Sequence, residues 1–215
     1  LPLPAKPYAR IEGLQAFVIE QMLESPNQLN ELMTQFWDNH FNTLYRKTFN
    51  ANYFELRDNQ RFRIAALGRF RDLLDISGKS PAMMTYLDNR HSTVHNVGEN
   101  YARELLELHT MGVDGGYTQH DVEFVAEIFT GWGVANRQFR FKPEHHVTGF
   151  KRFQGKIIRA GLGEEGILEG QELLDMLALH PSTARHICNK LIQFFVSDKA
   201  DSEVSISCAE GFLAQ

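Results

Sequence analysis

The sequence has few cysteines, no long apolar run and no large excess of charge of either sign, and each absence excludes a class of protein. Two cysteines, Cys188 and Cys208, are too few for a disulfide scaffold or a cysteine-rich zinc site. No apolar run is long enough to cross a bilayer, so the sequence predicts no membrane span. The net charge is −5 and basic residues are scattered among acidic ones, which argues against nucleic-acid binding.

The rest of the composition is that of an ordinary globular protein. Hydrophobic residues make up 43% and charged residues 23% of the chain, and 215 residues suffice for one large domain or two small ones. One disulfide is compatible with the two cysteines, but Cys188 falls in a predicted helix and Cys208 near the end of the chain, so two unpaired thiols are the preferred interpretation. The first residue is not methionine, and we expect a processed or truncated product whose targeting segment has been removed.

Apolar residues recur at helical spacing along most of the chain and predict a mainly α-helical protein. We expect an extended segment over residues 1–10, a single helical domain of about eight helices over residues 11–198, and a truncated C-terminal segment over residues 199–215. One helical region is predicted to run from Ile64 through Leu67 and Phe70 to Ser77-Gly78.

Three local patterns stand out in the second half of the chain. Gly98 to Met111 predicts an amphipathic helix, with Leu108 on its apolar side. Thr118 followed by Asp121 resembles a capping box at the start of the next helix. Alternating residues near Phe139 and near Ile157 predict one small β-hairpin around residues 145 to 155.

The polar side of the Gly98–Met111 helix is the first candidate site. Glu99, Arg103 and Glu107 are spaced four residues apart, so one guanidinium can bridge two carboxylates, and Asn100 and Glu104 lie on the same side. A solvated, self-paired helix face is one interpretation. The other is a cleft in which Arg103 binds an anion or orients a carboxylate that acts as acid, base or metal ligand.

Histidines are the other candidate ligands. His40 and His109 fall on apolar helix faces, so both are predicted to be buried and hydrogen-bonded. His91 and His95 have the spacing of two zinc ligands on a helix, but the glycine and β-branched residues around them disfavour a helix. Glu144-His145-His146 offers ligands on a loop, yet neighbours in an extended chain point to opposite faces. A divalent metal is therefore not the favoured interpretation, and the cofactor is left unknown.

Several segments, taken together, form a pattern that covers roughly residues 29 to 198. They are Phe36 to Phe41, Ser80 to Asn89, Glu99 to Gly112, Tyr117-Thr118, Thr130 to Trp132, His146 with Gly149 and Lys151, His180 to Ala184, and Lys190-Leu191. This pattern resembles a bacterial family catalogued as domain of unknown function eighteen hundred.

The resemblance implies a helical protein with no agreed activity. It implies an exported protein, periplasmic or extracellular, often encoded beside a sulfatase-like protein that is the candidate partner. It also favours a functional role for the polar side of the Gly98–Met111 helix, called the Arg103 row, because the family pattern includes that polar face. Val147 stands where the family has aspartate after His146, which weakens a metal site centred on His146.

We expect the Arg103 helix, the Trp132 turn and the hairpin from His146 to Lys151 to converge on one polar pocket. Clustering of polar motif residues in neighbouring segments is the motive for this hypothesis. The other residues assigned to the pocket are Glu99, Asn100 and His40.

Two functions compete for this pocket. One is an exported enzyme acting on a polar or anionic polymer, with Glu104 or Glu107 as acid or base, Arg103 and Lys151 holding the anion, and His146 shuttling protons. The other is a binding or assembly module that presents the pocket to a partner. A structural salt-bridge network is a third interpretation. An enzyme should have an enclosed pocket with a carboxylate or histidine whose pKa is displaced by burial, whereas a module should expose an apolar patch.

Overall fold

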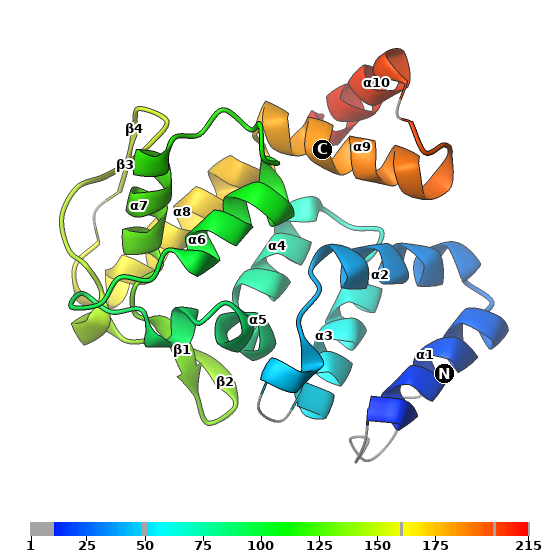
Figure 1. Ribbon diagram of the computed structural model, residues 1–215, viewed down its shortest axis with the longest axis horizontal. Coiled ribbons are helices and arrows are strands. Elements are labelled where there is room, and N and C mark those ends of the chain that lie inside the picture. The colour runs from blue at the N-terminus through cyan, green and yellow to red at the C-terminus, as the bar shows by residue number, and fades with distance from the viewer. Residues whose placement is uncertain (1–10, 49–50, 160, 200, 215) are drawn as a thin grey trace. The chain divides into compact units, whose positions relative to one another are not determined.

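The computed structural model describes residues 11–48, 51–159, 161–199 and 201–214, and these are mainly helical (Figure 1). They form ten α-helices and two small antiparallel hairpins, so the prediction of a mainly α protein is confirmed. Within the same ranges, no helix is long and apolar enough to cross a membrane. The predicted extended segment, residues 1–10, lies outside the described residues. By its internal contacts the chain divides into two compact units, Leu1–Tyr86 and Leu87–Gln215.

Helix α3 is central to the first unit, where it contacts α2, α4 and α5. The α-helices of this unit are α1 (Ile11–Glu24), α2 (Gln28–His40), α3 (Ala51–Ala65), α4 (Phe70–Gly78) and α5 (Pro81–Tyr86). Aromatic side chains from α2, α3 and α4 fill the core, and Trp37 Nε1 donates a hydrogen bond to the Ala66 carbonyl at 2.9 Å. His40 is 5% exposed and packs against Phe41 at 4.5 Å between ring centroids, so its predicted burial is confirmed.

The helical region predicted across Ile64 and Phe70 is wrong, because two helices occupy it. α3 ends at Ala65, and the Gly68 amide donates to the Ala65 carbonyl at 2.8 Å in the turn before α4. Ile64 and Leu67 are 88% and 61% exposed, so neither belongs to the apolar side of a continuous helix. A tight turn can interrupt a helix while the apolar spacing on its two sides happens to agree.

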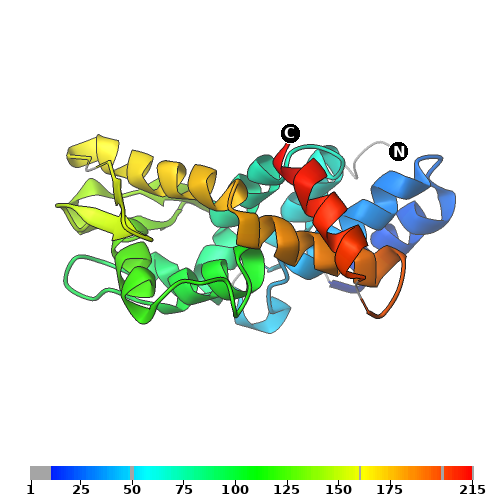
Figure 2. The same cartoon turned by 90° about the horizontal axis from the view of Figure 1, so that it is seen from above.

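The second unit combines helices with two hairpins. Its elements are α6 (Asn100–Glu104), the π-helix η3 (Leu105–Thr110), α7 (Gln119–Ile128), β1 (Trp132–Ala135), β2 (Gln138–Phe141), β3 (Lys151–Phe153), β4 (Lys156–Ile158), α8 (Ile167–Ala178), α9 (Pro181–Phe195) and α10 (Ser202–Leu213). α9 follows α8 after a break at Leu179 and His180 (Figure 2). The capping box predicted at Thr118 and Asp121 is confirmed at the start of α7. α7 contacts α6 and also β3.

The helix predicted from Gly98 to Met111 changes from α to π geometry at Leu105. Buried residues come in pairs four apart, at Tyr101-Ala102, Leu105-Leu106 and His109-Thr110. This repeat is longer than the 3.6 residues of an α-helical turn, and the wider π turn keeps all three pairs on one side. The placement of Leu108 on the apolar side is consequently wrong, because its side chain is 49% exposed.

His109 is 6% exposed, which confirms its predicted place in the core. Burial, with smaller contributions from Lys190 and His186, lowers the pKa of His109 to about 3. The side chain is therefore neutral at physiological pH.

The presence of small β-hairpin structure is confirmed, but the predicted pairing across residues 145 to 155 is wrong, because the strands pair in two separate hairpins. β1 pairs with β2, with Trp132 opposite Phe141, and β3 pairs with β4, with Lys151 opposite Ile158. Tight turns explain the difference: Asn136 and Arg137 adopt positive φ between β1 and β2, and so do Gln154 and Gly155 between β3 and β4. Each alternating segment therefore has its own neighbour in sequence as its partner.

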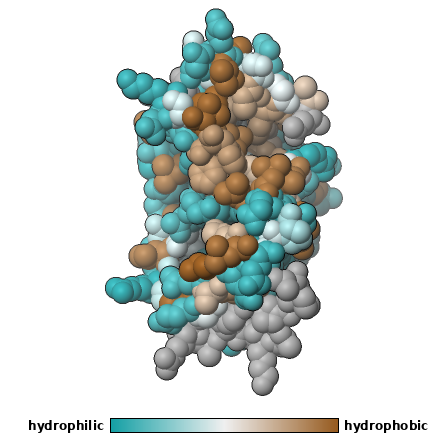
Figure 3. Space-filling view, turned by 90° about the vertical axis from the view of Figure 1, so that its right-hand side faces the viewer, coloured by the Kyte–Doolittle hydropathy of each residue, from teal (hydrophilic) through white to brown (hydrophobic). Residues whose placement is uncertain are grey.

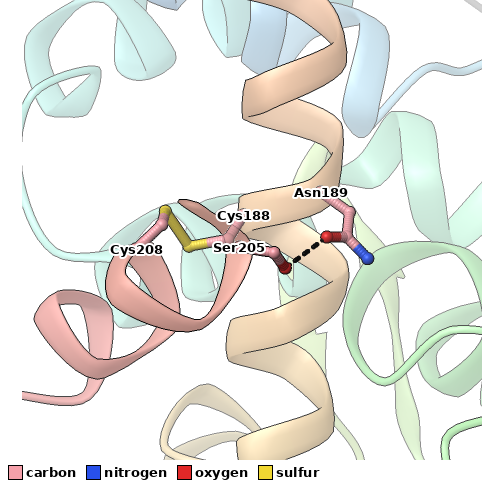
Figure 4. The surroundings of a disulfide bond; sticks show 4 residues. All are labelled: Cys188, Asn189, Ser205 and Cys208. Carbon is pink, nitrogen blue, oxygen red and sulfur yellow. Dashed lines mark hydrogen bonds between the residues drawn. A yellow bond between two sulfur atoms is a disulfide. The ribbon is translucent and has the colours of Figure 1, made fainter. Parts of the chain in front are cut away.

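The cysteines are joined, so the preference for two free thiols is wrong. α10 packs on α9 and brings the Cα atoms of Cys188 and Cys208 to 5.8 Å, within the usual range for a disulfide (Figure 4). Beside the disulfide, the Ser205 hydroxyl donates a hydrogen bond of 2.5 Å to Asn189 Oδ1. Sequence separation alone could not reveal that the last helix folds back along α9.

Candidate functional site

Part of the predicted site lies at the surface. Arg103 and Glu99 form an ion pair at 3.0 Å, with side chains 40% and 41% exposed. Gln119 of α7 closes a triangle, since it accepts a hydrogen bond from Arg103 at 2.8 Å and donates one to Glu99 at 2.9 Å. Partial burial and the neighbouring Glu107 raise the pKa of Glu104, against the effect of Arg103. This row is a half-exposed, self-paired helix face.

A second part of the predicted site is in the interior. The Lys151 side chain is 1% exposed, and its Nζ donates to the Val147 carbonyl and to Glu169, both at 2.6 Å. His146 lies beside this pair: its Nδ1 is 2.9 Å from the Thr130 carbonyl, and its Nε2 is 3.3 Å from Glu169 Oε2, within ion-pair distance but outside hydrogen-bond geometry. Lys151 and Glu169 therefore form a buried ion pair, and His146 lies against it in the interior.

The ionised state of Glu169 is favoured by its neighbours. Burial acts to raise its pKa, but His146, Lys151 and the Gly161 amide, which donates to Oε1 at 2.9 Å, outweigh burial and lower it. A carboxylate in a low-dielectric interior is tolerated only with such partners. The cluster ties β3 to α8 and to the segment that follows β2.

These contacts do not bring the predicted residues to one pocket. Lys151 is engaged with Glu169 in the interior, whereas Arg103 is engaged with Glu99 and Gln119 at the surface. Trp132 is fully buried and belongs to the core around the hairpins, and Asn100 donates to the Leu87 carbonyl at 3.2 Å. The catalytic roles assigned to Arg103, Glu104, Glu107, His146 and Lys151 stay predictions.

Glu169 was missed from the sequence, although one signal was present. It shares a helical face with Leu173 and Leu177, which are fully buried. An acidic residue on an otherwise apolar stripe indicates a buried partner of opposite charge.

A cavity of about 560 Å³ in the first unit was also not predicted, and it is the better candidate site. Acidic side chains reach it from two helices, Asp38 from α2 and Glu55 and Asp58 from α3. Apolar residues of α1 and Met83 of α5 form other parts of its wall. Among its described lining residues there is no lysine, arginine or histidine. The volume is in the range of cavities that hold small ligands.

Helix α3 supplies this acidic wall through its periodicity. Glu55, Asp58, Asn59 and Phe62 follow one another at intervals of three, one and three residues, so they share one face of the helix and all line the cavity. The apolar Phe62 anchors this face in the core at 3% exposure. The carboxyl groups of Glu55 and Asp58 on the same face are thereby held partly out of water.

Burial changes the acidity of all three carboxyl groups. It raises the pKa of Asp38 to about 7, against the Asn59 hydrogen bond and Arg63, and the nearby carboxylates of Glu55 and Asp58 raise it further. Burial also raises the pKa of Asp58, against a hydrogen bond from Ser80, and that of Glu55, against a hydrogen bond from Thr43 at 2.5 Å. Asp38 is thus poised to exchange a proton near neutral pH.

A chain of hydrogen bonds fixes the position of Asp38. The Asn59 side-chain amide donates to Asp38 Oδ2 and accepts from Arg63 Nη1, the latter at 2.6 Å. Arg63 Nε in turn lies 3.0 and 3.2 Å from the two oxygens of Glu31. Each polar group has a defined partner, which keeps the carboxyl in one orientation.

No group of three or more histidine, cysteine, aspartate or glutamate side chains in the described ranges has the arrangement of a metal site. The acidic cavity contains three carboxyl groups, those of Asp38, Glu55 and Asp58, whose pKa values are raised by burial. Carboxyl groups with shifted pKa values in a cavity are typical of acid–base catalytic sites.

Comparison with known proteins gives a family and nothing closer. No curated protein matches the chain, and neither does a solved structure. A family model described as "Protein of unknown function (DUF1800)" matches residues 4–215, and the chain therefore belongs to that family.

Proposed function

We propose that the protein is an acid–base enzyme of hydrolase type, with its site in the acidic cavity of the first unit. The observation that carries this proposal is the half-buried carboxyl of Asp38, held by Asn59 at the wall of a ligand-sized cavity. A carboxyl that is partly protonated at neutral pH can give a proton to a leaving group and take one from water. Glu55 and Asp58 supply further carboxyl groups at the same wall.

The charge of the cavity selects its substrate. Three acidic side chains and no described basic side chain line it, so an anionic group inside would be repelled. Amide and hydroxyl groups of Asn39, Asn42 and Tyr45 add hydrogen-bonding partners. We propose a polar substrate that is neutral or cationic, such as a polyhydroxyl or amino-sugar chain, in place of the anionic polymer considered from the sequence.

Export is part of the proposal. The disulfide between Cys188 and Cys208 supports it, because disulfides persist in oxidising compartments such as the periplasm and the extracellular space.

Turnover of a panel of neutral glycans and amino-sugar polymers, followed by release of reducing ends, tests the enzyme. We expect wild-type activity to fall at least about 100-fold in Asp38→Asn, which keeps the shape of the side chain but cannot exchange a proton. Asp72→Asn is the control, because Asp72 pairs with Arg69 at the surface and does not line the cavity. Equal activity of Asp38→Asn and wild type would refute the role of Asp38, and absence of turnover across the panel would refute the substrate class.

A binding module is the second candidate, favoured by exposed apolar side chains on α1 and α2. Ile19, Leu23 and Leu29 are 56%, 77% and 59% exposed. Figure 3 shows apolar side chains in separate areas on one face, with hydrophilic side chains between them. In this alternative the protein binds a partner such as a sulfatase-like protein through such areas or through the Arg103 row. Co-purification of the protein with that partner tests this alternative. We expect co-purification of the wild type and its loss when Arg103 or Leu23 is replaced by glutamate.

A further inference from the structure

A second cavity of the first unit, of about 540 Å³, has a charge opposite to that of the acidic cavity. Three arginines, Arg57, Arg61 and Arg63, line it together with one acidic residue, Glu31. Amide side chains, including Gln21 and Gln60, account for much of the remaining polar lining. The balance of charge is therefore positive.

Helix α3 produces both cavities because its two sides differ. We call the first group on α3 the acidic set, which consists of Glu55, Asp58, Asn59 and Phe62. A second group, the basic set, consists of Arg57, Gln60, Arg61 and Ile64. Both sets have the spacing three, one and three residues, and the basic set is shifted by two positions. A shift of two residues turns side chains about 200° around a helix, so the basic set faces away from the acidic set. All four residues of the basic set line the second cavity.

Two of the arginines are held in defined orientations. Arg63 is fixed by Glu31 and Asn59, and its guanidinium lies 5.5 Å from the centre of the Phe17 ring. Arg57 lies over the Phe54 ring at 5.5 Å and 3.6 Å from Asp58. Rigid guanidinium groups with several N–H donors are suited to oxyanions. Glu31 offsets the charge of its partner Arg63, so the positive excess of the cavity comes from Arg57 and Arg61.

The beginning of α2 reinforces the positive potential. Asn27, the residue before the first turn of α2, lines the cavity, and its side chain makes no capping hydrogen bond to the helix. Ser25, Pro26 and Asn30 also line it, so the N-terminal end of this 13-residue helix borders the cavity. The N-terminus of a helix carries a partial positive charge and favours anions. Arginines and the helix end thus point to the same type of ligand.

We infer that this second cavity binds an oxyanion group, a carboxylate or a phosphate, of a ligand. Arg61 is the contact most open to solvent, whereas Arg63 and Arg57 form the wall behind it. The inference does not depend on the proposed enzyme activity, since none of the acidic set of α3 lines this cavity.

Calorimetric titration with inorganic phosphate, and separately with acetate, tests this inference at an ionic strength held constant with sodium chloride. We expect saturable binding with a dissociation constant at or below about 1 mM for at least one of the two ions. The stronger of the two arms identifies the chemistry of the natural group. Absence of saturable heat with both ions would overturn the inference.

Two arginine variants make the test specific. Arg61→Gln should weaken binding about tenfold, because it removes a charged donor at an exposed position without disturbing the core. Arg69→Gln removes the same charge from a surface residue outside the cavity and should leave binding unchanged. Equal weakening in both variants would show general charge attraction and would also overturn the inference. Ion binding is measured without any substrate of the acidic cavity, so failure of the enzyme proposal, seen as absence of turnover across the glycan panel, can be told apart from failure of this one.

Discussion

Replacing Lys151 by methionine should destabilise the protein strongly, because the change leaves Glu169 charged and buried. Both side chains are 1% exposed and their charged groups are 2.6 Å apart. Removing one partner of a buried ion pair typically costs about 3–5 kcal/mol. Glu169 would keep the Gly161 amide at 2.9 Å and His146 at 3.3 Å, so we expect the lower end, about 3 kcal/mol.

Urea denaturation followed by circular dichroism measures this loss as a lower free energy of unfolding. Arg152→Met is the matched control, because it removes a basic side chain from the next residue of β3, which is exposed, and should change stability by no more than about 0.5 kcal/mol. The double variant Lys151→Met with Glu169→Gln should recover most of the loss, since it leaves no uncompensated charge. A cost below about 1 kcal/mol for Lys151→Met alone would refute the interpretation of the cluster as a buried, mutually dependent set.

Three further predictions concern other parts of the chain. Reducing the disulfide should lower the free energy of unfolding by about 3 kcal/mol and should increase amide hydrogen exchange first in α10. Equal exchange of the α10 amides in the oxidised and reduced protein would contradict this. Gly170→Ala should destabilise by about 1–3 kcal/mol, because its Cβ would lie 2.4 Å from a Trp132 ring carbon, whereas Gly211→Ala, with open space around it in α10, should be neutral or stabilising; thermal melts compare the two. The folded protein binds a proton at Asp38 more tightly than the unfolded chain does. The contribution of this proton to stability is therefore largest below about pH 4 and is lost as the pH rises to about 7. In urea titrations, Asp38→Asn should gain more stability relative to wild type at pH 8 than at pH 4.

Helical periodicity was enough to predict the class of fold but not the boundaries. The apolar spacing that runs from Ile64 to Phe70 continues across a turn at Gly68, so the pattern alone merged two helices. The paired burial of Leu105-Leu106 and His109-Thr110 differs from an α-helical stripe only by a slow drift, which short helices conceal. Such features depend on packing, and the sequence contains them only as weak departures from the regular period.

The candidate site shows where sequence reasoning stops. Lys151 and His146 were assigned to the candidate site through the family pattern, but their shared partner is Glu169 of α8, so the contact is set by tertiary structure. The acidic and basic sets of α3 were visible as two interleaved helical patterns beginning at Glu55 and Arg57. Neither set belongs to a motif, unlike the segment around Arg103. Charge segregated on two sides of one helix would have been the signal.

The most direct measurement of the central claim is the titration of Asp38 by carbon-13 NMR of its carboxyl group. We predict a midpoint at about pH 7, caused by burial at the wall of the acidic cavity. A neutral glycan or amino-sugar ligand that enters the cavity should shift this midpoint, whereas phosphate should shift it little. A midpoint near the ordinary value of about 4 would contradict the account, because Asp38 would then be an ordinary, fully ionised surface carboxylate with no proton to exchange at neutral pH.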